Sequence, residues 1–231
     1  LAIQNSQFAV GIDCRTALAR KTGDRTYCLN LLRGLAALEL DPAKWEFHLL
    51  LDGDDCDGIL PRAAYFKPVI LPAENSRWWT VGVLPRYARR AKLDLVHVQY
   101  LAPPILSCPF VTTIHDVVWK TFPQTFPRAH RIVMNAALPQ TARRAVRVLC
   151  GTQSAASDIK KFLPIRRAKI RVTPYAIDPI FSAPISSQQI SAARQKYALG
   201  NAPYVLSVGV LQPRKNLPRL ISAFEKLKSQ H

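Results

Sequence analysis

Short apolar runs alternate along this chain with longer segments in which apolar residues recur at helical spacing. The short runs are rich in Val, Ile and Leu, as strands buried on both faces are. They predict strands at residues 8–12, 45–51, 65–71, 94–98, 110–114, 146–150, 170–173 and 204–208. Helices are predicted at 27–38, 77–91, 128–145, 155–162, 185–199 and 217–227. This alternation indicates an α/β fold with a doubly wound parallel sheet and right-handed crossovers.

The pattern also predicts local detail within these elements. In the first helix an apolar stripe is expected to face the core, formed by Tyr27, Leu31, Leu35 and Leu38. Pro68 predicts that the third strand is short or lies at a sheet edge, because proline cannot donate to a β ladder. Pro85 is expected to kink or split the helix at 77–91. Ser154 is the expected N-cap of the helix that follows the strand at 146–150.

The segment 203–224 predicts a strand, a short basic loop and a helix. Asn216 is a suitable N-cap, and Pro218 falls in the first turn, where its missing N–H is tolerated. Free N–H groups and the positive end of the helix dipole would therefore lie beside Arg214 and Lys215, which favours a phosphate site. From spacing alone, an ordinary βα unit with a solvated basic loop is an equal alternative.

The run Val-Gly-Val-Leu-Gln-Pro-Arg-Lys-Asn-Leu at 208–217 resembles the opening of the donor-binding domain in group 1 glycosyltransferases (family 4, GT-B fold). In that family an Arg and a Lys at this point bind the diphosphate of a nucleotide sugar. The resemblance assigns this role to Arg214 and Lys215, with Gly209 letting the backbone come close. It implies a Rossmann-like acceptor domain at 1–183, a link at 184–202, and the first βα unit of a second Rossmann-like domain at 203–231.

Other stretches resemble the acceptor domain of the same family. His115 and Asp116 follow a strand, where ligands bind in open α/β sheets, and the family's histidine here lies close to the transferred sugar. Gly23 and Arg25 stand where the family has a glycine-rich loop, although its second glycine is absent. The resemblance adds Tyr100, Ser154 and Tyr175 to the acceptor-side or loop residues. His97, within a strand, is expected to be a core residue or a residue that supports the site, and not a catalyst.

Composition sets limits on the function. The net charge of +17 over 231 residues points to an anionic partner, and hydrophobic content of 48% supports a folded core. No apolar run approaches the length of a membrane span, and the first ten residues do not resemble a signal peptide. Five widely spaced cysteines favour reduced thiols in a cytoplasmic protein over a disulfide framework or zinc site. Because the first residue is Leu1 and not Met, we expect that the sequence is a fragment at its N-terminus.

Two stretches leave alternatives open. Asp52 and Asp54 lie in an Asp- and Gly-rich turn after a strand, which suits either a metal site or a solvated turn; the solvated turn is favoured because no further calcium-loop residues follow. The helix at 77–91 carries Trp78 and Trp79 beside several arginines. It fits equally an interfacial membrane helix or a core helix with a solvated basic face.

The resemblance implies transfer of a sugar from a nucleotide-diphosphate sugar to an acceptor hydroxyl, with retained configuration and without a bound metal. Polysaccharide or glycolipid synthesis is the expected setting, on a sugar or lipid-linked acceptor at the inner membrane face. The chain ends early in the donor domain and lacks the family's glutamate pair, so we expect that it does not turn over alone. The alternative is a non-catalytic basic module for anionic lipid or nucleic acid; no nucleic-acid motif is present.

Overall fold

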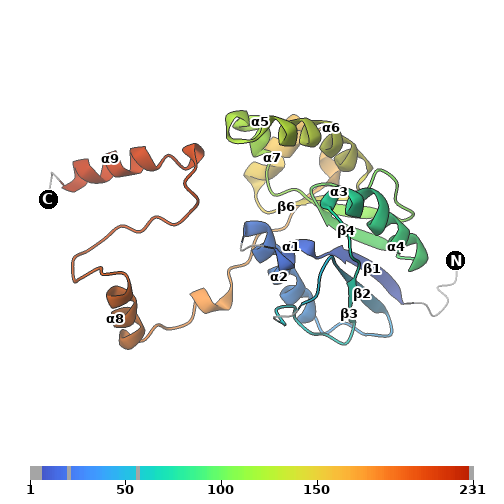
Figure 1. Ribbon diagram of the computed structural model, residues 1–231, viewed down its shortest axis with the longest axis horizontal. Coiled ribbons are helices and arrows are strands. Elements are labelled where there is room, and N and C mark those ends of the chain that lie inside the picture. The colour runs from blue at the N-terminus through green and yellow to red at the C-terminus, as the bar shows by residue number, and fades with distance from the viewer. Residues whose placement is uncertain (1–6, 20–21, 56–57, 229–231) are drawn as a thin grey trace.

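The computed structural model describes residues 7–19, 22–55 and 58–228 of the chain. One parallel sheet of seven strands forms its centre (Figure 1). The strands are β1 (Phe8–Asp13), β2 (Trp45–Leu51), β3 (Phe66–Ile70), β4 (Leu95–Gln99), β5 (Phe110–Thr113), β6 (Arg147–Cys150) and β7 (Ile170–Val172). Each lies within one residue of its predicted bounds, and β3 is at an edge, as Pro68 predicts.

The strand order is β3-β2-β1-β4-β5-β6-β7, so the direction of progress through the sheet reverses between β1 and β4. Helices lie between the strands in sequence. They are α1 (Arg15–Leu18), α2 (Gly23–Ala36), α3 (Ser76–Trp78), α4 (Leu84–Arg90), α5 (Val118–Thr121), α6 (Arg128–Arg144) and α7 (Gln153–Phe162). This is the doubly wound, Rossmann-like arrangement that the alternating pattern predicts.

Two apolar cores lie on opposite faces of the sheet. Helices α1 and α2 pack on one face through residues such as Leu32, which meets Leu49 and Leu51. Helices α4, α6 and α7 pack on the other face, where Leu50 contributes to the core. Successive residues of β2 therefore serve opposite layers, as the two-residue period of a strand requires.

The helix predicted at 77–91 is continuous but changes its hydrogen-bond pattern. Between α3 and α4 a π-helical turn, η1 (Trp79–Val83), carries the backbone past Pro85. A π turn closes i→i+5 bonds, here from the Leu84 N–H to the Trp79 carbonyl, and it accommodates a residue that cannot donate. Trp79 is fully buried, as the core interpretation predicts, and Trp78 is 45% exposed. The interpretation as an interfacial membrane helix stays a prediction.

Two local predictions were wrong. Thr152, and not Ser154, caps α7: its hydroxyl accepts from the Ala155 N–H at 3.0 Å, and Ser154 lies inside the first turn. The buried stripe of α2 is Cys28, Leu29 and Leu32. The predicted stripe is only half-buried at Tyr27, Leu31 and Leu35, because these residues border a cavity, and of the three Leu35 also packs against the core. Leu38 lies beyond the helix and is 60% exposed.

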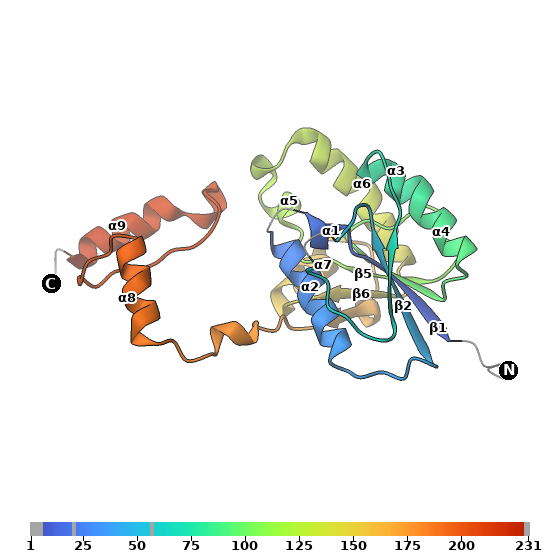
Figure 2. The same ribbon diagram turned by 60° about the horizontal axis from the view of Figure 1, so that its bottom comes forward.

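The strand predicted at 204–208 does not form. Val205, Leu206 and Val208 are each more than 60% exposed, and no neighbouring strand pairs with this segment among the described residues. A strand needs a partner to satisfy its backbone groups, so apolar sequence alone does not produce one. The flanking helices α8 (Ser187–Lys196) and α9 (Leu217–Lys228) do form, and both views show them apart from the sheet (Figures 1 and 2).

This difference in packing predicts different effects of the same substitution. Leu32→Ala removes a fully buried side chain and should lower the free energy of unfolding by about 2–5 kcal/mol. Leu206→Ala, at a side chain that is 73% exposed, should change it by less than about 0.5 kcal/mol. Urea unfolding followed by circular dichroism measures both, and a large loss from Leu206→Ala would mean that this segment packs on the folded core.

Candidate active site

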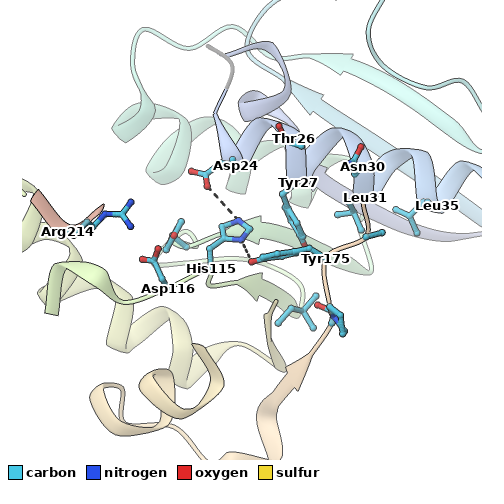
Figure 3. Close-up of a pocket in the computed structure, with 17 residues that line it drawn as sticks. Asp24, Thr26, Tyr27, Asn30, Leu31, Leu35, His115, Asp116, Tyr175 and Arg214 are labelled. Carbon is cyan, nitrogen blue, oxygen red and sulfur yellow. Dashed lines mark hydrogen bonds and ion pairs between the residues drawn. The ribbon is translucent and has the colours of Figure 1, made fainter. Parts of the chain in front are cut away.

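A cavity of about 850 Å³ opens at the carboxyl ends of the strands. One wall is α2, and the other is formed by the residues that follow β4, β5 and β7 (Figure 3). It adjoins the point between β1 and β4 where the strand order reverses, at which open α/β sheets bind their ligands. Its lining residues include Asp24, Tyr27, Asn30, Leu31, Tyr100, His115, Asp116, Tyr175 and Arg214.

The imidazole of His115 is held from both sides. Gln99 donates its amide N–H to Thr16 Oγ1 at 2.8 Å, so its carbonyl oxygen is the atom that faces His115 Nε2 at 3.0 Å. Nε2 therefore carries a proton and donates to Gln99. The other nitrogen, Nδ1, is left to accept from the Tyr175 hydroxyl at 2.6 Å. This arrangement suits a neutral ring of fixed tautomer.

Electrostatics keep that ring neutral. Burial lowers the pKa of His115, and the nearby carboxylates of Asp24 and Asp116 oppose this shift without reversing it. Asp24 Oδ1 lies 3.9 Å from Nε2, at the limit of an ion pair (Figure 3). Burial also raises the pKa of Tyr175, so its hydroxyl keeps the proton that it donates to Nδ1.

Three tyrosines surround His115. The ring of Tyr27 lies edge-on at 4.7 Å between centroids, and those of Tyr100 and Tyr175 lie at 5.6 and 5.8 Å. Gly151 makes this possible, since a Cβ there would come within 2.1 Å of the Tyr175 ring. Aromatic rings next to polar groups are suited to bind a sugar, because its C–H faces pack on rings while its hydroxyls form hydrogen bonds.

Buried residues support the ring cluster from below. The hydroxyl of Thr113, at the end of β5, lies 2.8 Å from both the Tyr27 hydroxyl and His97 Nε2. Thr113 and His97 are buried, so His97 is a core residue, one of the two alternatives predicted for it. Tyr100 follows β4 with a left-handed backbone (φ 58°), a conformation that costs a non-glycine residue about 1 kcal/mol or more. Its N–H nevertheless bonds the Thr113 carbonyl at 2.9 Å.

The two carboxylates that line the cavity, Asp24 and Asp116, have different local environments. Asp116 Oδ1 accepts from the Val118 N–H at 3.1 Å and so fixes the turn into α5. Asp24 stands in the first turn of α2, where the positive end of the helix dipole favours a carboxylate. A third carboxylate, Asp13 at the end of β1, is fully engaged in a bidentate ion pair with Arg15 at 2.7 and 2.9 Å. Asp24 and Asp116 are therefore the groups with free acceptor capacity toward a ligand hydroxyl.

The structure brings together most of the residues singled out on the acceptor side. His115, Asp116, Tyr100, Tyr175 and Gly23 all line the cavity. Gly23 lies in the first turn of α2 rather than before the helix, since Thr22 is the N-cap. The two remaining acceptor-side predictions do not reach the cavity. Arg25 turns away and donates to the Ala17 carbonyl at 2.9 Å, which ties α2 to α1, and Ser154 belongs to α7.

Of the residues predicted to bind the donor diphosphate, only Arg214 lies at the cavity. Arg214 lines the cavity, and its Nε donates to Gln212 Oε1 at 2.8 Å. Lys215 is exposed and does not line the cavity, and a Cβ at Gly209 would meet nothing within 4 Å. Asn216 precedes α9 with a left-handed backbone (φ 52°) instead of the extended one of a usual N-cap.

Several site residues were missed by the sequence analysis. Gln99 and Thr113 end neighbouring strands, and their place beside His115 follows only from the pairing of β4 with β5. Tyr27 and Leu31 were interpreted as core residues, and Asp24 was passed over. The polar residues at the strand ends were a usable signal, because the carboxyl ends of parallel strands meet at one edge.

The described part of the acidic turn has the internal hydrogen bonds of an ordinary turn. Asp55 accepts from the N–H groups of Ile59 and Leu60, which is the role of a turn residue. No cluster of three or more metal-ligating side chains is found among the described residues; Cys56 and Asp57 lie outside them. No helix within the described ranges is long and apolar enough to cross a membrane.

The buried histidine generates a pH prediction. Burial lowers the pKa of His97 to about 4, against about 6.5 in an unfolded chain, so the folded state resists protonation. Stability from this group is complete above pH 6.5 and falls between about pH 6.5 and 4, by about 3 kcal/mol in all. Between pH 6.5 and 4, the free energy of unfolding should decrease less in His97→Gln than in the parent chain. The exposed control His130→Gln should follow the parent chain. Parallel curves for the parent and His97→Gln would contradict this.

Comparisons with known proteins agree with the fold. Among solved structures, a glycosyltransferase from Rickettsia africae superposes with a TM-score of 0.62 at 14% identity, covering 96% of this chain and 58% of that one. Anabaena Alr3699/HepE in complex with UDP and glucose superposes with a TM-score of 0.52 at 16% identity, over 85% of this chain and 51% of that one. At these identities the likeness shows the GT-B fold alone.

Two sequence comparisons go further. The O-antigen chain mannosyltransferase B of Escherichia coli is 28% identical over 117 residues, which are 51% of this chain and 30% of that protein. The chain thus spans only part of the relatives that it matches. The profile described as Glycosyltransferase Family 4 matches residues 22–181, more than two thirds of the chain, and this range includes every lining residue of the cavity apart from Arg214. The chain therefore belongs to glycosyltransferase family 4.

Proposed function

We propose that this chain supplies the acceptor side of an enzyme that transfers a sugar from a nucleotide-diphosphate sugar to an acceptor hydroxyl. The observation that carries the proposal is the cluster at the carboxyl edge: a neutral His115 among three tyrosines, with Asp24 and Asp116 beside it. The membership of family 4 and the UDP and glucose bound by a protein of the same fold support it.

The cluster suggests how each group acts. The carboxylates of Asp24 and Asp116 accept hydrogen bonds from acceptor hydroxyls, and the tyrosine rings pack on the sugar. His115, fixed by Gln99 and Tyr175, positions the sugar that is transferred. Loss of the diphosphate leaves positive charge on the sugar and negative charge on the leaving group, and preorganised donors and cations stabilise such charge. No protein nucleophile or metal is assigned.

The donor side of the proposal rests on residues 203–231 as the start of a nucleotide-binding domain. Arg214 reaches the cavity from this segment, and Lys215 follows it. Both would bind the diphosphate together with the N-terminus of α9, once a domain of this type surrounds them. The division at 183 and 202 remains part of this proposal.

The kind of acceptor and its location at a membrane are also part of the proposal. A lipid-linked or polysaccharide acceptor at the inner face of a membrane fits the net charge of +17 and the O-antigen relative. Basic surface binds anionic lipid, so the protein should sediment with phosphatidylglycerol vesicles at low salt. If the protein does not sediment with these vesicles, the location at a membrane is contradicted, whereas the proposed sugar transfer is not affected. Non-catalytic binding of anionic lipid or nucleic acid is the rival function, and it predicts no transfer at all.

The experiment is a transfer assay on the chain extended by a complete nucleotide-binding domain, with UDP- and GDP-sugars and mannose-containing acceptors. His115→Ala should lower kcat strongly, because it removes the group beside the reacting sugar. Arg214→Ala with Lys215→Ala should weaken UDP or GDP binding by about tenfold or more in calorimetry, as loss of charge-assisted hydrogen bonds predicts.

The matched control for the donor pair is Lys228→Ala, an exposed basic residue in the last turn of α9 that does not line the cavity. It should leave nucleotide affinity within about twofold of the parent, which is less than 0.5 kcal/mol. If no sugar is transferred from any donor and no nucleotide binds, the proposal fails and the rival function gains.

A further inference from the structure

A second cavity lies on the other side of the domain, against α3 and α4. Its volume is about 280 Å³, and it shares no lining residue with the cavity around His115. Trp78, Arg86, Tyr87 and Arg90 line it, together with the residues that follow β3. Figures 1 and 2 show α3 and α4 on the side of the sheet away from α8 and α9. The groove against α3 and α4 is therefore separate from the cavity around His115.

The aromatic wall of this groove is held in place. A Cβ on Gly82 would come within 3.1 Å of three ring carbons of Trp78, so the indole lies close against a backbone that has no side chain there. Gly82 belongs to the π turn η1, and such turns inside α-helices occur frequently at functional sites. The Tyr87 hydroxyl is anchored to His48 Nδ1 on β2 at 2.7 Å. Trp78 nevertheless remains 45% exposed at the mouth.

The charge of the groove is uncompensated. Arg86 and Arg90 are four residues apart on α4, a spacing at which like charges destabilise a helix. Neither forms an ion pair with any residue that the structure describes. The sequence from 75 to 93 contains no Asp or Glu. An anion between the two guanidinium groups would relieve this repulsion.

We propose that this groove binds the phosphate group of an organic phosphate whose apolar part lies against Trp78. Two guanidinium groups can each form paired N–H···O bonds with phosphate oxygens. The volume accommodates a phosphate and a small apolar group, and a longer chain would leave through the open mouth beside the indole. The same chemistry is offered by a soluble phosphate ester and by the phosphate headgroup of an anionic lipid.

The test measures binding to the 231-residue chain in two arms. Phenyl phosphate is titrated by calorimetry, and vesicles of phosphatidylcholine with or without phosphatidylglycerol are used for co-sedimentation. Arg86→Gln with Arg90→Gln should weaken the probe that binds by about tenfold or more, since both charge-assisted contacts are lost. Trp78→Ala should weaken it further, by loss of the apolar contact.

The matched control removes the same charge elsewhere. Arg166→Gln with Arg167→Gln, at exposed positions beside the 3₁₀ turn before β7, should leave binding within about twofold of the parent. Loss of phenyl phosphate binding in the groove variant alone identifies a soluble ester, and loss of vesicle binding alone identifies a lipid headgroup. Equal weakening by both pairs, or no binding of either probe by the parent chain, would overturn the proposal.

Discussion

Parallel pairing of β1 with β4, and of β4 with β5, is the constraint on which the site depends. It aligns the carboxyl ends of strands that are far apart in sequence, and the reversal of strand order at β1 and β4 leaves room there for a ligand. Gln99, Thr113 and His115 leave neighbouring strands at this edge and meet without any long loop. The two cores on either face hold the sheet and so fix this edge.

The ring cluster shows how a buried polar network can position one functional group. His115 receives one hydrogen bond and donates another, and Thr113 links Tyr27 to His97 underneath. Both ring nitrogens of His115 have a partner, as do the Thr113 hydroxyl and Nε2 of His97, and these hydrogen bonds offset the cost of burial and fix the tautomer of His115. The left-handed backbone at Tyr100 is a local strain within the same cluster.

Much of the architecture could be predicted from the sequence, because seven apolar runs are long enough to specify buried strands. Prediction from the sequence failed where the structure of a segment depends on the segments that pack beside it in the fold. Tyr27 and Leu31 border a cavity that periodicity cannot distinguish from core, and 204–208 lacks the neighbour that a strand requires. Thr152 and Ser154 are both suitable caps by composition, and only the backbone decides between them. His115 was found through a family resemblance, whereas Gln99 needed the strand register.

The most direct measurement is a nuclear magnetic resonance titration of the 231-residue chain with methyl α-mannoside and methyl α-glucoside, observing the side chains of His115 and Tyr175. The account predicts saturable shifts of both signals with at least one sugar, and their loss in Tyr27→Ala, which removes a wall of the cavity but not the reporting groups. Signals of His115 and Tyr175 that stay unchanged up to the solubility limit of both sugars, in a chain that remains folded, would contradict the claim that this cavity is the sugar-binding side of a transferase.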